Sequence, residues 1–533
     1  MPLSALELFI ALAAVAVALD FLARKLATPR PVVLAAGGLL LGIALRGVPG
    51  LPALQVDPQT SLDIVLPPLL AVAAFRVPLG AFRASLRPIT LLAVGLVLAT
   101  MAGVAAVAHA IVPGVTWAAG WVLGAVVAPP DPVAATTVGR GLGLPNRLVT
   151  ILEGEGLVND AGALVTYQLA VAAVVTGVFS WQHAGLEVVR SVPVGVLTGL
   201  AVGWATAFIR RRVDDVMIET AVSLLLPYVA YLLAERLGGS AVLSVVAFGF
   251  FIRRRATEIG TPATRLVSRT VWQAIDFVTG GLVFILVGLE LGRVVAAGLS
   301  GPLIAQAAVV SAAAIAIRLG WTYFVPHVVR MVTREPRESM LTMAELTVLG
   351  WSGMRGVVSL ALALAIPMQT AAGEPFPARH ALVTIALVVV LATLLGQGLT
   401  LAPLVRALGL ADPDASKRQE HEARTAAVEA GRACIDRRAA DRELAPDVHG
   451  RLVERLGQDV GLTAANGDGR EAALPGGHEV VEVLLEALEC ERAAILRLRD
   501  DGRLNEESAA SLEAELDLDE LTLRGDAGQL AAQ

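Results

Sequence analysis

The chain has 533 residues, of which 55% are hydrophobic and 17% charged, and its formal net charge is −6. With a mean hydropathy of +0.68, this composition excludes a soluble globular domain as a description of the whole chain. Aromatic residues contribute only 5%, so the apolar mass is mainly Ala, Val, Leu and Gly, whose small members let membrane helices approach closely. We therefore expect an all-α polytopic membrane protein.

Apolar windows of about 20 residues predict about 13 transmembrane helices. Their approximate limits are 3–22, 31–46, 60–75, 88–112, 116–138, 148–178, 187–209, 216–235, 240–252, 271–292, 302–325, 341–366 and 381–405. The loops that begin at residues 23, 76, 139, 210, 253 and 330 hold 19 Lys and Arg residues, whereas the intervening loops hold four. The positive-inside rule then predicts a multi-pass membrane protein with its amino terminus outside and its carboxyl terminus in the cytoplasm.

Two of these apolar segments are interrupted. Three prolines surround Asp131 within residues 129–132, and proline breaks a helix because it lacks an N–H group and clashes with the preceding turn. Residues 350–356 place three glycines and Arg355 in a second segment, a weaker indication of a break. Interrupted segments in both halves of a transporter point to a site at mid-membrane, where Asp131 and Arg355 can offset the partial charges of the half-helix ends.

Charge divides the chain near residue 410. Residues 411–533 carry 28 acidic and 15 basic side chains, a net of −13, whereas the residues before them carry 20 and 27, a net of +7. This contrast predicts a transmembrane domain over 1–410 and an acidic, helical, cytosolic carboxyl-terminal domain over 411–533. We expect the acidic face of this tail to be a solvated surface. Its two cysteines, Cys434 and Cys490, predict no disulfide framework.

Asp160 is the most informative charged residue of the membrane part. An aspartate at the centre of a membrane helix costs roughly 2.5–3.5 kcal/mol on insertion scales, so it indicates a proton or cation pathway. At helical spacing Gly156 and Asp160 share one face, while Glu155 and Asn159 share the adjacent face. Asp160 and Asp131 together offer oxygen ligands for a monovalent metal cation, and the same carboxylates bind protons. Such a site exchanges the two ions by competition.

Glu155 would be a costly buried charge without a partner. Arg355 is always protonated and can bind a carboxylate through two hydrogen bonds, so we predict a structural ion pair between Glu155 and Arg355. Arg318 lies inside another apolar segment, where it could support the core electrostatically; the alternative is that it extends to the membrane interface. Asp276 lies near the end of a segment, and we expect it to be solvated.

Three stretches of the chain resemble the bacterial sodium/proton antiporters of the first monovalent cation:proton antiporter family. They are residues 128–133 with the Asp-Pro element, 152–165 with Glu-Gly-Glu and Asn-Asp, and 351–364 with Trp-Ser-Gly-Met-Arg-Gly. The resemblance implies inverted repeats with two crossed discontinuous helices, and a six-helix core beside a separate dimerisation domain. It also implies a homodimer in the lipid bilayer of the bacterial plasma membrane that works by elevator-type alternating access.

The resemblance also implies roles for individual residues. Asp160 and Asp131 would bind the cation and the proton, Asn159 and the backbone of Pro130 would support the site, and Asn before Asp160 would mark electroneutral one-for-one exchange. Two positions depart from the family pattern, because Pro130 stands where Thr is usual and Gly156 stands where Ser is common. In relatives this Ser is an ion ligand. Two alternatives follow from its absence: a water molecule replaces it as a ligand, or the site prefers the larger K⁺.

The sequence thus predicts a secondary active transporter, not an enzyme, that exchanges Na⁺, or Li⁺ or K⁺, for H⁺. It predicts no cofactor and no nucleic-acid partner. A K⁺/H⁺ antiporter is the nearest alternative, and a sodium-coupled organic-solute symporter is a more distant one, since few intramembrane Asn, Gln or Ser residues could line its cavity. A channel would need a continuous polar pore. A two-aspartate protease could use Asp131 and Asp160, but the Pro-Asp-Pro break argues against it.

Overall fold

The computed structural model describes residues 5–26, 28–45, 58–177, 181–213, 215–255, 259–297, 300–333, 341–442, 449–450, 452 and 478–531. Within these ranges the chain is almost entirely helical, with no β-strand beyond an isolated bridge between Gln369 and Pro375. Seven of the described helices are long and apolar enough to cross a membrane. Other helices and pairs of half-helices occupy the remaining expected segments. The expectation of an all-α polytopic membrane fold is confirmed.

The membrane helices form two groups, each of which packs mainly within itself. The first, which we name the core group, is built around contacts of α6 with α7 and α14, of α7 with α9, and of α14 with α17. Its members are α4 (Leu79–Ala84), α5 (Leu86–Thr90), the π-helical turn η1 (Leu91–Leu96), α6 (Val97–Ile111), α7 (Trp117–Val127), α8 (Pro132–Gly141), α9 (Asn146–Thr176), α14 (Gly301–Thr333), α15 (Met343–Trp351), α16 (Val357–Leu364) and α17 (Arg379–Ala407). Small and branched apolar side chains fill its interior, among them Val104, Leu123 and Ile385.

The second group, which we name the scaffold group, contains the remaining membrane helices. They are α1 (Ala5–Lys25), α2 (Arg30–Leu45), α3 (Pro58–Arg76), α10 (Trp181–Arg210), α11 (Val216–Arg236), α12 (Ala241–Arg254) and α13 (Pro262–Ala297). Glycines allow α2 and α13 to touch along their backbones. A Cβ atom on Gly38 would lie 2.3 Å from the carbonyl oxygen of Ile285, and one on Gly288 would lie 2.1 Å from that of Ala35. These glycines therefore set the distance between the two helices.

Both predicted helix breaks are present. Helix α7 ends at Val127 and α8 begins at Pro132, while α15 ends at Trp351 and α16 begins at Val357. The two connecting segments meet in the interior of the protein, where the backbone N–H of Asp131 donates to the carbonyl oxygen of Met354 at 2.6 Å. The non-helical backbone at this depth is thus satisfied partly by the other broken segment.

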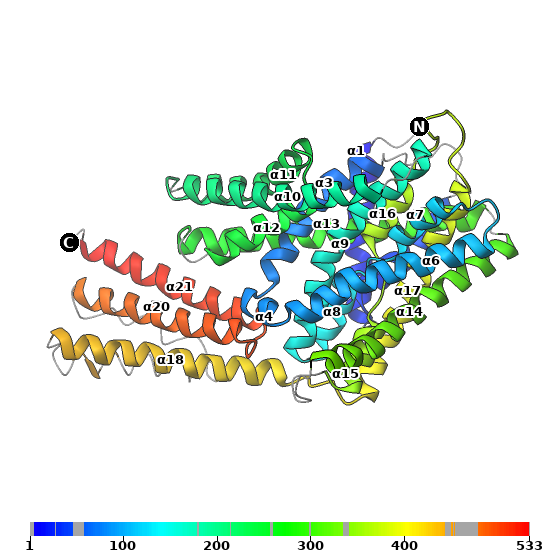
Figure 1. The fold of residues 1–533 in the computed structure, drawn as a ribbon. Coiled ribbons are helices and arrows are strands. Elements are labelled where there is room, and N and C mark those ends of the chain that lie inside the picture. The colour runs from blue at the N-terminus through cyan, green and yellow to red at the C-terminus, as the bar shows by residue number, and fades with distance from the viewer. Residues whose placement is uncertain are drawn as a thin grey trace.

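Three helices of the acidic tail pack side by side and project from one end of the membrane body (Figure 1). They are α18 (Ala415–Arg442), α20 (His478–Asp500) and α21 (Glu506–Ala531), and we refer to them as the carboxyl-terminal bundle. The bundle has its own apolar interior, and a disulfide that the sequence did not predict links Cys434 to Cys490. The apolar residues that recur at helical spacing over 480–518 are divided between α20 and α21. Two Gly-containing stretches, 466–469 and 475–477, predict breaks between helical segments of the tail and lie outside the described residues.

Candidate ion-binding site

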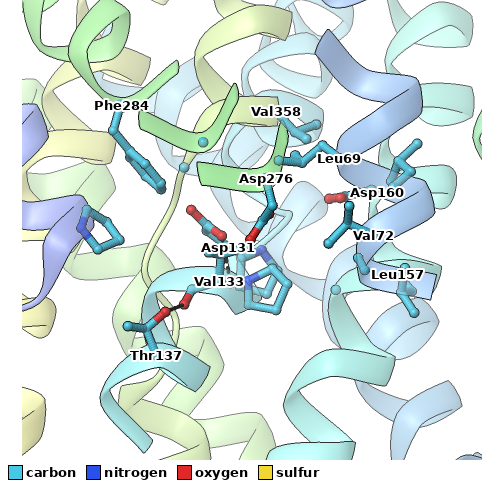
Figure 2. A pocket seen from close by; sticks show the side chains of 18 of the residues that line it. Leu69, Val72, Asp131, Val133, Thr137, Leu157, Asp160, Asp276, Phe284 and Val358 are labelled. Atoms are coloured by element: carbon cyan, nitrogen blue, oxygen red, sulfur yellow. Dashed lines mark hydrogen bonds between the residues drawn. The ribbon is translucent and has the colours of Figure 1, made fainter. Parts of the chain in front are cut away.

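A cavity of about 210 Å³ lies between the core and scaffold groups. Core residues of α8, α9 and α16 line one side of it, and scaffold residues of α2, α3 and α13 line the other. Asp131 and Asp160 both line this cavity, and Figure 2 shows their side chains beside it. The two carboxylates singled out in the sequence are therefore brought together at the boundary between the two helix groups.

Asp131 is held by one of its carboxylate oxygens. It is the N-cap of α8, and its Oδ1 accepts a hydrogen bond of 2.9 Å from the backbone N–H of Val133. Its Oδ2 is buried and has no hydrogen-bond partner among the described residues. Gly356 allows the close approach, since a Cβ atom there would lie 2.0 Å from this Oδ2. Asp131 is thus fixed in orientation while one oxygen stays available for an ion.

Helix α9 sorts its polar residues as the helical spacing predicts. Gly156 and Asp160 line the cavity, whereas Glu155 and Asn159 are not among its lining residues. Asn159 is fully buried, and neither atom of its amide group has a hydrogen-bond partner among the described residues. Asn159 therefore lies outside the cavity wall, next to Asp160 in the chain.

The two departures from the family pattern lie together at the cavity wall. Pro130 lines the cavity, and Gly156 packs against the ring of Pro132. A Cβ atom on Gly156 would lie 2.3 Å from Cγ and 2.7 Å from Cδ of that ring. The site therefore lacks a side-chain oxygen at position 156, and the present packing has no space for one.

The predicted ion pair between Glu155 and Arg355 is wrong, because Glu155 binds Arg318 instead. The two guanidinium nitrogens of Arg318 donate to the two carboxylate oxygens of Glu155 at 2.6 and 2.9 Å. Arg318 also donates to the carbonyl oxygen of Leu349 at 3.1 Å. The side chain of Arg318 is 2% exposed and that of Glu155 is 1% exposed. Arg318 therefore supports the core and does not extend to the membrane interface.

Arg355 donates hydrogen bonds to backbone carbonyl oxygens at the two helix breaks. Its Nε donates to the carbonyl oxygen of Val127 at 2.9 Å, at the carboxyl end of α7, and its Nη1 donates to the carbonyl oxygen of Gly353. The positive guanidinium thus satisfies the negative end of one half-helix, while Asp131 caps the positive end of the next. This matches the expected compensation of the half-helix ends.

Sequence reasoning missed a third carboxylate at the cavity. Asp276 of α13 lines it (Figure 2) and forms an ion pair of 2.6 Å with Arg76, the last residue of α3. Arg30 also lines the cavity and is paired with Asp20 at 2.7 Å. The apolar window that predicts this helix begins at residue 271, so in the sequence Asp276 lies near a segment end. The helix begins at Pro262 instead, which places Asp276 about four turns inside it.

Two interrupted helices that cross beside a carboxylate-lined cavity, within a polytopic helical body, define a transport protein with discontinuous membrane helices. A family model described as sodium/hydrogen exchanger, transmembrane, matches residues 10–407. The chain therefore belongs to the sodium/hydrogen exchanger family, which confirms the resemblance found in the sequence.

Individual relatives agree with this assignment. The chain is 32% identical over 530 residues to an uncharacterized Na⁺/H⁺ exchanger of Mycobacterium tuberculosis, covering 97% of this chain and 96% of the relative. It is 32% identical over 396 residues to the Na⁺/H⁺ antiporter ApNhaP of Aphanothece halophytica, covering 73% of each chain. Its fold is similar to that of the sodium proton antiporter MjNhaP1 from Methanocaldococcus jannaschii, with a TM-score of 0.57, 17% identity, and coverage of 76% of this chain and 99% of the other.

Alanine at position 156 is expected to disturb the site. Its Cβ would press on the Pro132 ring and displace the segment that carries Asp131, and such overpacking costs about 1–3 kcal/mol. Gly156→Ala and Gly156→Ser should both lower the thermal unfolding temperature of the purified protein. Gly162→Ala is the matched control, because a Cβ atom there meets nothing within 4 Å. Equal unfolding temperatures for the 156 and 162 variants would contradict the packing described here.

A double-mutant cycle should distinguish the two arginines near Glu155. Breaking one partner of a buried ion pair typically costs about 3–5 kcal/mol, so Glu155→Gln and Arg318→Gln should each lower the free energy of unfolding strongly. Their combination should cost clearly less than the sum, with a coupling of about 1–3 kcal/mol. Glu155→Gln combined with Arg355→Gln should show a weaker coupling, because Arg355 interacts with the charge of Glu155 but its side-chain hydrogen bonds go to backbone carbonyl oxygens. The free energies of unfolding are measured by denaturant titration in detergent. A coupling of Glu155 to Arg355 that is stronger than its coupling to Arg318 would support the pairing predicted from sequence.

Proposed function

We propose that this protein exchanges a monovalent cation for a proton across the plasma membrane, with Asp131 and Asp160 as the shared binding site. The observation that carries the proposal is the convergence of these two carboxylates on one cavity between the helix groups. The cation takes carboxylate oxygens as ligands, and the proton occupies the same groups when the cation leaves. The backbone of Pro130, which lines the cavity, completes the proposed site, and Asn159 supports it from outside the cavity lining.

The mechanism we propose is alternating access, in which the core group moves relative to the scaffold group. The cavity lies between the groups and extends to Arg76, whose side chain is 39% exposed. Farther along α13 and α16 from the cavity lining, the side chains of Val287, Leu291 and Leu360 are buried in a packed apolar cluster. Arg76 belongs to one of the basic loops assigned to the cytoplasm, so this arrangement corresponds to the inward-facing state, with the amino terminus outside and the carboxyl terminus inside.

Exchange in this scheme is electroneutral, one cation for one proton, and the protein acts as a homodimer assembled through the scaffold group. One proton and one monovalent cation carry the same charge, so both loaded states take the same net charge through the membrane interior and one complete cycle moves no net charge. Helix α10 presents Leu197, Trp204 and Phe208 at its exposed surface. These apolar side chains suit either contact with lipid or contact with a second copy.

The transported cation is Na⁺ or K⁺. Relatives support both, since an antiporter of Bacillus pumilus that is 31% identical over 368 residues is named for sodium, potassium, lithium and rubidium. The absence of a side-chain oxygen at position 156 leaves one fewer ligand for the smaller ion. This favours a K⁺/H⁺ antiporter as the second candidate.

Asp160→Asn is expected to abolish exchange, because an amide neither binds a proton nor supplies a negative charge to the cation. The measurement is the collapse of a preset pH gradient in proteoliposomes after Na⁺, Li⁺ or K⁺ is added at several pH values. Glu290→Gln provides the control, since Glu290 lies on α13 outside the cavity lining and pairs with Arg293. Retained exchange in Asp160→Asn, at a rate similar to that of the control, would refute the assignment of the site.

A further inference from the structure

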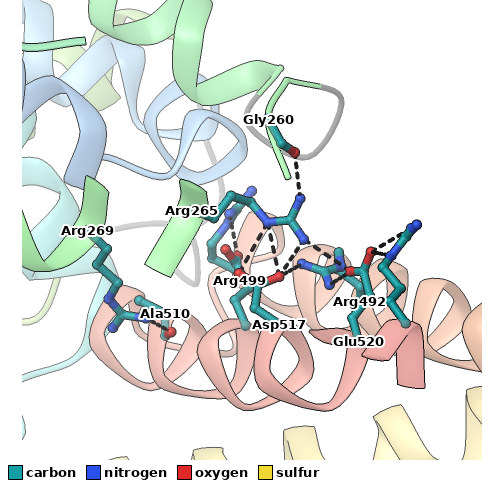
Figure 3. A network of polar contacts seen from close by, with 10 residues as sticks. Gly260, Arg265, Arg269, Arg492, Arg499, Ala510, Asp517 and Glu520 are labelled. Carbon is teal, nitrogen blue, oxygen red and sulfur yellow. Dashed lines mark hydrogen bonds and ion pairs between the residues drawn. The ribbon is translucent and has the colours of Figure 1, made fainter. Parts of the chain in front are cut away.

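The carboxyl-terminal bundle is bound to both helix groups of the membrane domain. On the scaffold side, Arg265 of α13 binds Asp517 of α21 at 3.0 Å and Glu520 at 3.2 Å. Arg269 donates to the carbonyl oxygen of Ala510 on the same helix, as Figure 3 shows. Asp517 is only 4% exposed, so this part of the tail's acidic face is a buried contact and the expectation of a fully solvated surface is wrong.

On the core side, the contacts are hydrogen bonds and close backbone packing. The side-chain amide of Asn146, the first residue of α9, donates to the carbonyl oxygen of Gly502 at 3.0 Å and to Gln419 of α18 at 3.1 Å. Gly80 of α4 lies against Asp500, where a Cβ atom would come 2.3 Å from the carbonyl oxygen. The same bundle therefore holds the core group at α4 and α9 and the scaffold group at α12 and α13.

We name the region where the bundle contacts the membrane domain the joint. A second cavity, of about 60 Å³, lies there and is lined by both the bundle and the core group. Glu506, at the start of α21, lines it and is 10% exposed in its side chain. One oxygen of Glu506 binds Arg253 of α12, and the other is buried without a hydrogen-bond partner among the described residues. A carboxyl group with one open oxygen in a small polar cavity is suited to take up a proton.

Charged groups surround Glu506 from every side of the joint. Arg253 comes from α12 and Arg499 from α20, while Glu153 comes from α9 and Glu513 from α21 itself. The nearby charges are further paired: Glu153 with Arg140 of α8, and Arg499 with Asp500 and Glu513. Glu507 also lines the cavity.

We propose that the carboxyl-terminal bundle is a clasp that bridges the core and scaffold groups and slows exchange while it is docked, and that Glu506 is a second, regulatory proton-binding site. This proposal rests on the proposed function, because a bridge between the two groups matters only if they move relative to each other. A docked bundle holds both groups in the arrangement described here. Release of either side frees the core group to move.

The direction of the pH effect follows from linkage. Burial in the joint raises the pKa of Glu506 to about 7, although Arg253 and Arg499 act in the opposite direction, whereas a glutamate in water has a pKa of about 4.3. Docking is therefore coupled to proton uptake: it is strongest below about pH 4.3, weakens as the cytosolic pH rises from there to about 7, and changes little at higher pH. An antiporter that brings protons inward would then be held back in an acidified cytosol and released as the cytosol returns to about pH 7.

The test uses the full-length protein with two readouts, deuterium uptake by the backbone of α21 and cation-dependent collapse of a pH gradient in proteoliposomes. In the wild type, uptake by α21 should be slow at pH 6 and faster at pH 8. Glu506→Gln, which cannot ionise, should lose this difference and remain docked. Arg265→Gln should speed uptake at pH 6 and raise exchange about threefold or more, as expected when a minor undocked population grows.

Arg424→Gln is the matched control. Arg424 is 15% exposed and binds Glu515 within the bundle, whereas Arg265 is 18% exposed and binds across the joint. The control should leave deuterium uptake by α21 at the joint and the exchange rate at pH 6 unchanged. An Arg265→Gln variant that loosens α21 without faster exchange would overturn the clasp, and a pH response that persists in Glu506→Gln would overturn the proton site. Absence of exchange in the wild type would instead overturn the proposed function, while deuterium uptake would still report whether docking depends on pH.

Discussion

The structure depends on the crossing of two non-helical segments in the middle of the membrane body. The hydrogen bond from the Asp131 backbone to Met354 joins these segments directly, and Gly356 allows the Asp131 carboxylate to lie against the second segment. Since unpaired backbone groups at this depth cost several kcal/mol each, the crossing persists only because each segment supplies partners for the other. Arg355 extends this exchange to the end of α7. The cavity of the candidate site is lined by residues of both crossing segments.

The buried carboxylates divide into structural and functional ones by their hydrogen bonds. Glu155 has both oxygens occupied by Arg318, so neither oxygen is open to an ion. Asp131 keeps one oxygen open, and Asp160 lines the cavity. Asp276 is intermediate, since it reaches the cavity but is paired with Arg76. This geometry is the basis on which we propose the two aspartates as the exchange site.

Local sequence rules predicted the features that depend on local physics. The Pro-Asp-Pro segment breaks its helix whatever surrounds it, and helical spacing separated the Asp160 face from the Glu155 face. The partner of Glu155 was not predictable in this way, because Arg318 and Arg355 both lie in apolar segments and only tertiary packing decides which one meets it. The docking of the bundle was missed for the same reason. Asp517 in an acidic amphipathic helix looks solvated until Arg265, more than 250 residues earlier, lies against it.

Competition between a proton and a cation for the same carboxylates is the central claim, and proton release on cation binding tests it most directly. Purified protein in weakly buffered detergent solution would be titrated with NaCl or KCl near neutral pH, with calorimetry for cation binding and a pH-sensitive dye for released protons. The account predicts about one proton released for each cation bound, as linkage at a shared site requires. Cation binding at full stoichiometry without proton release would contradict it.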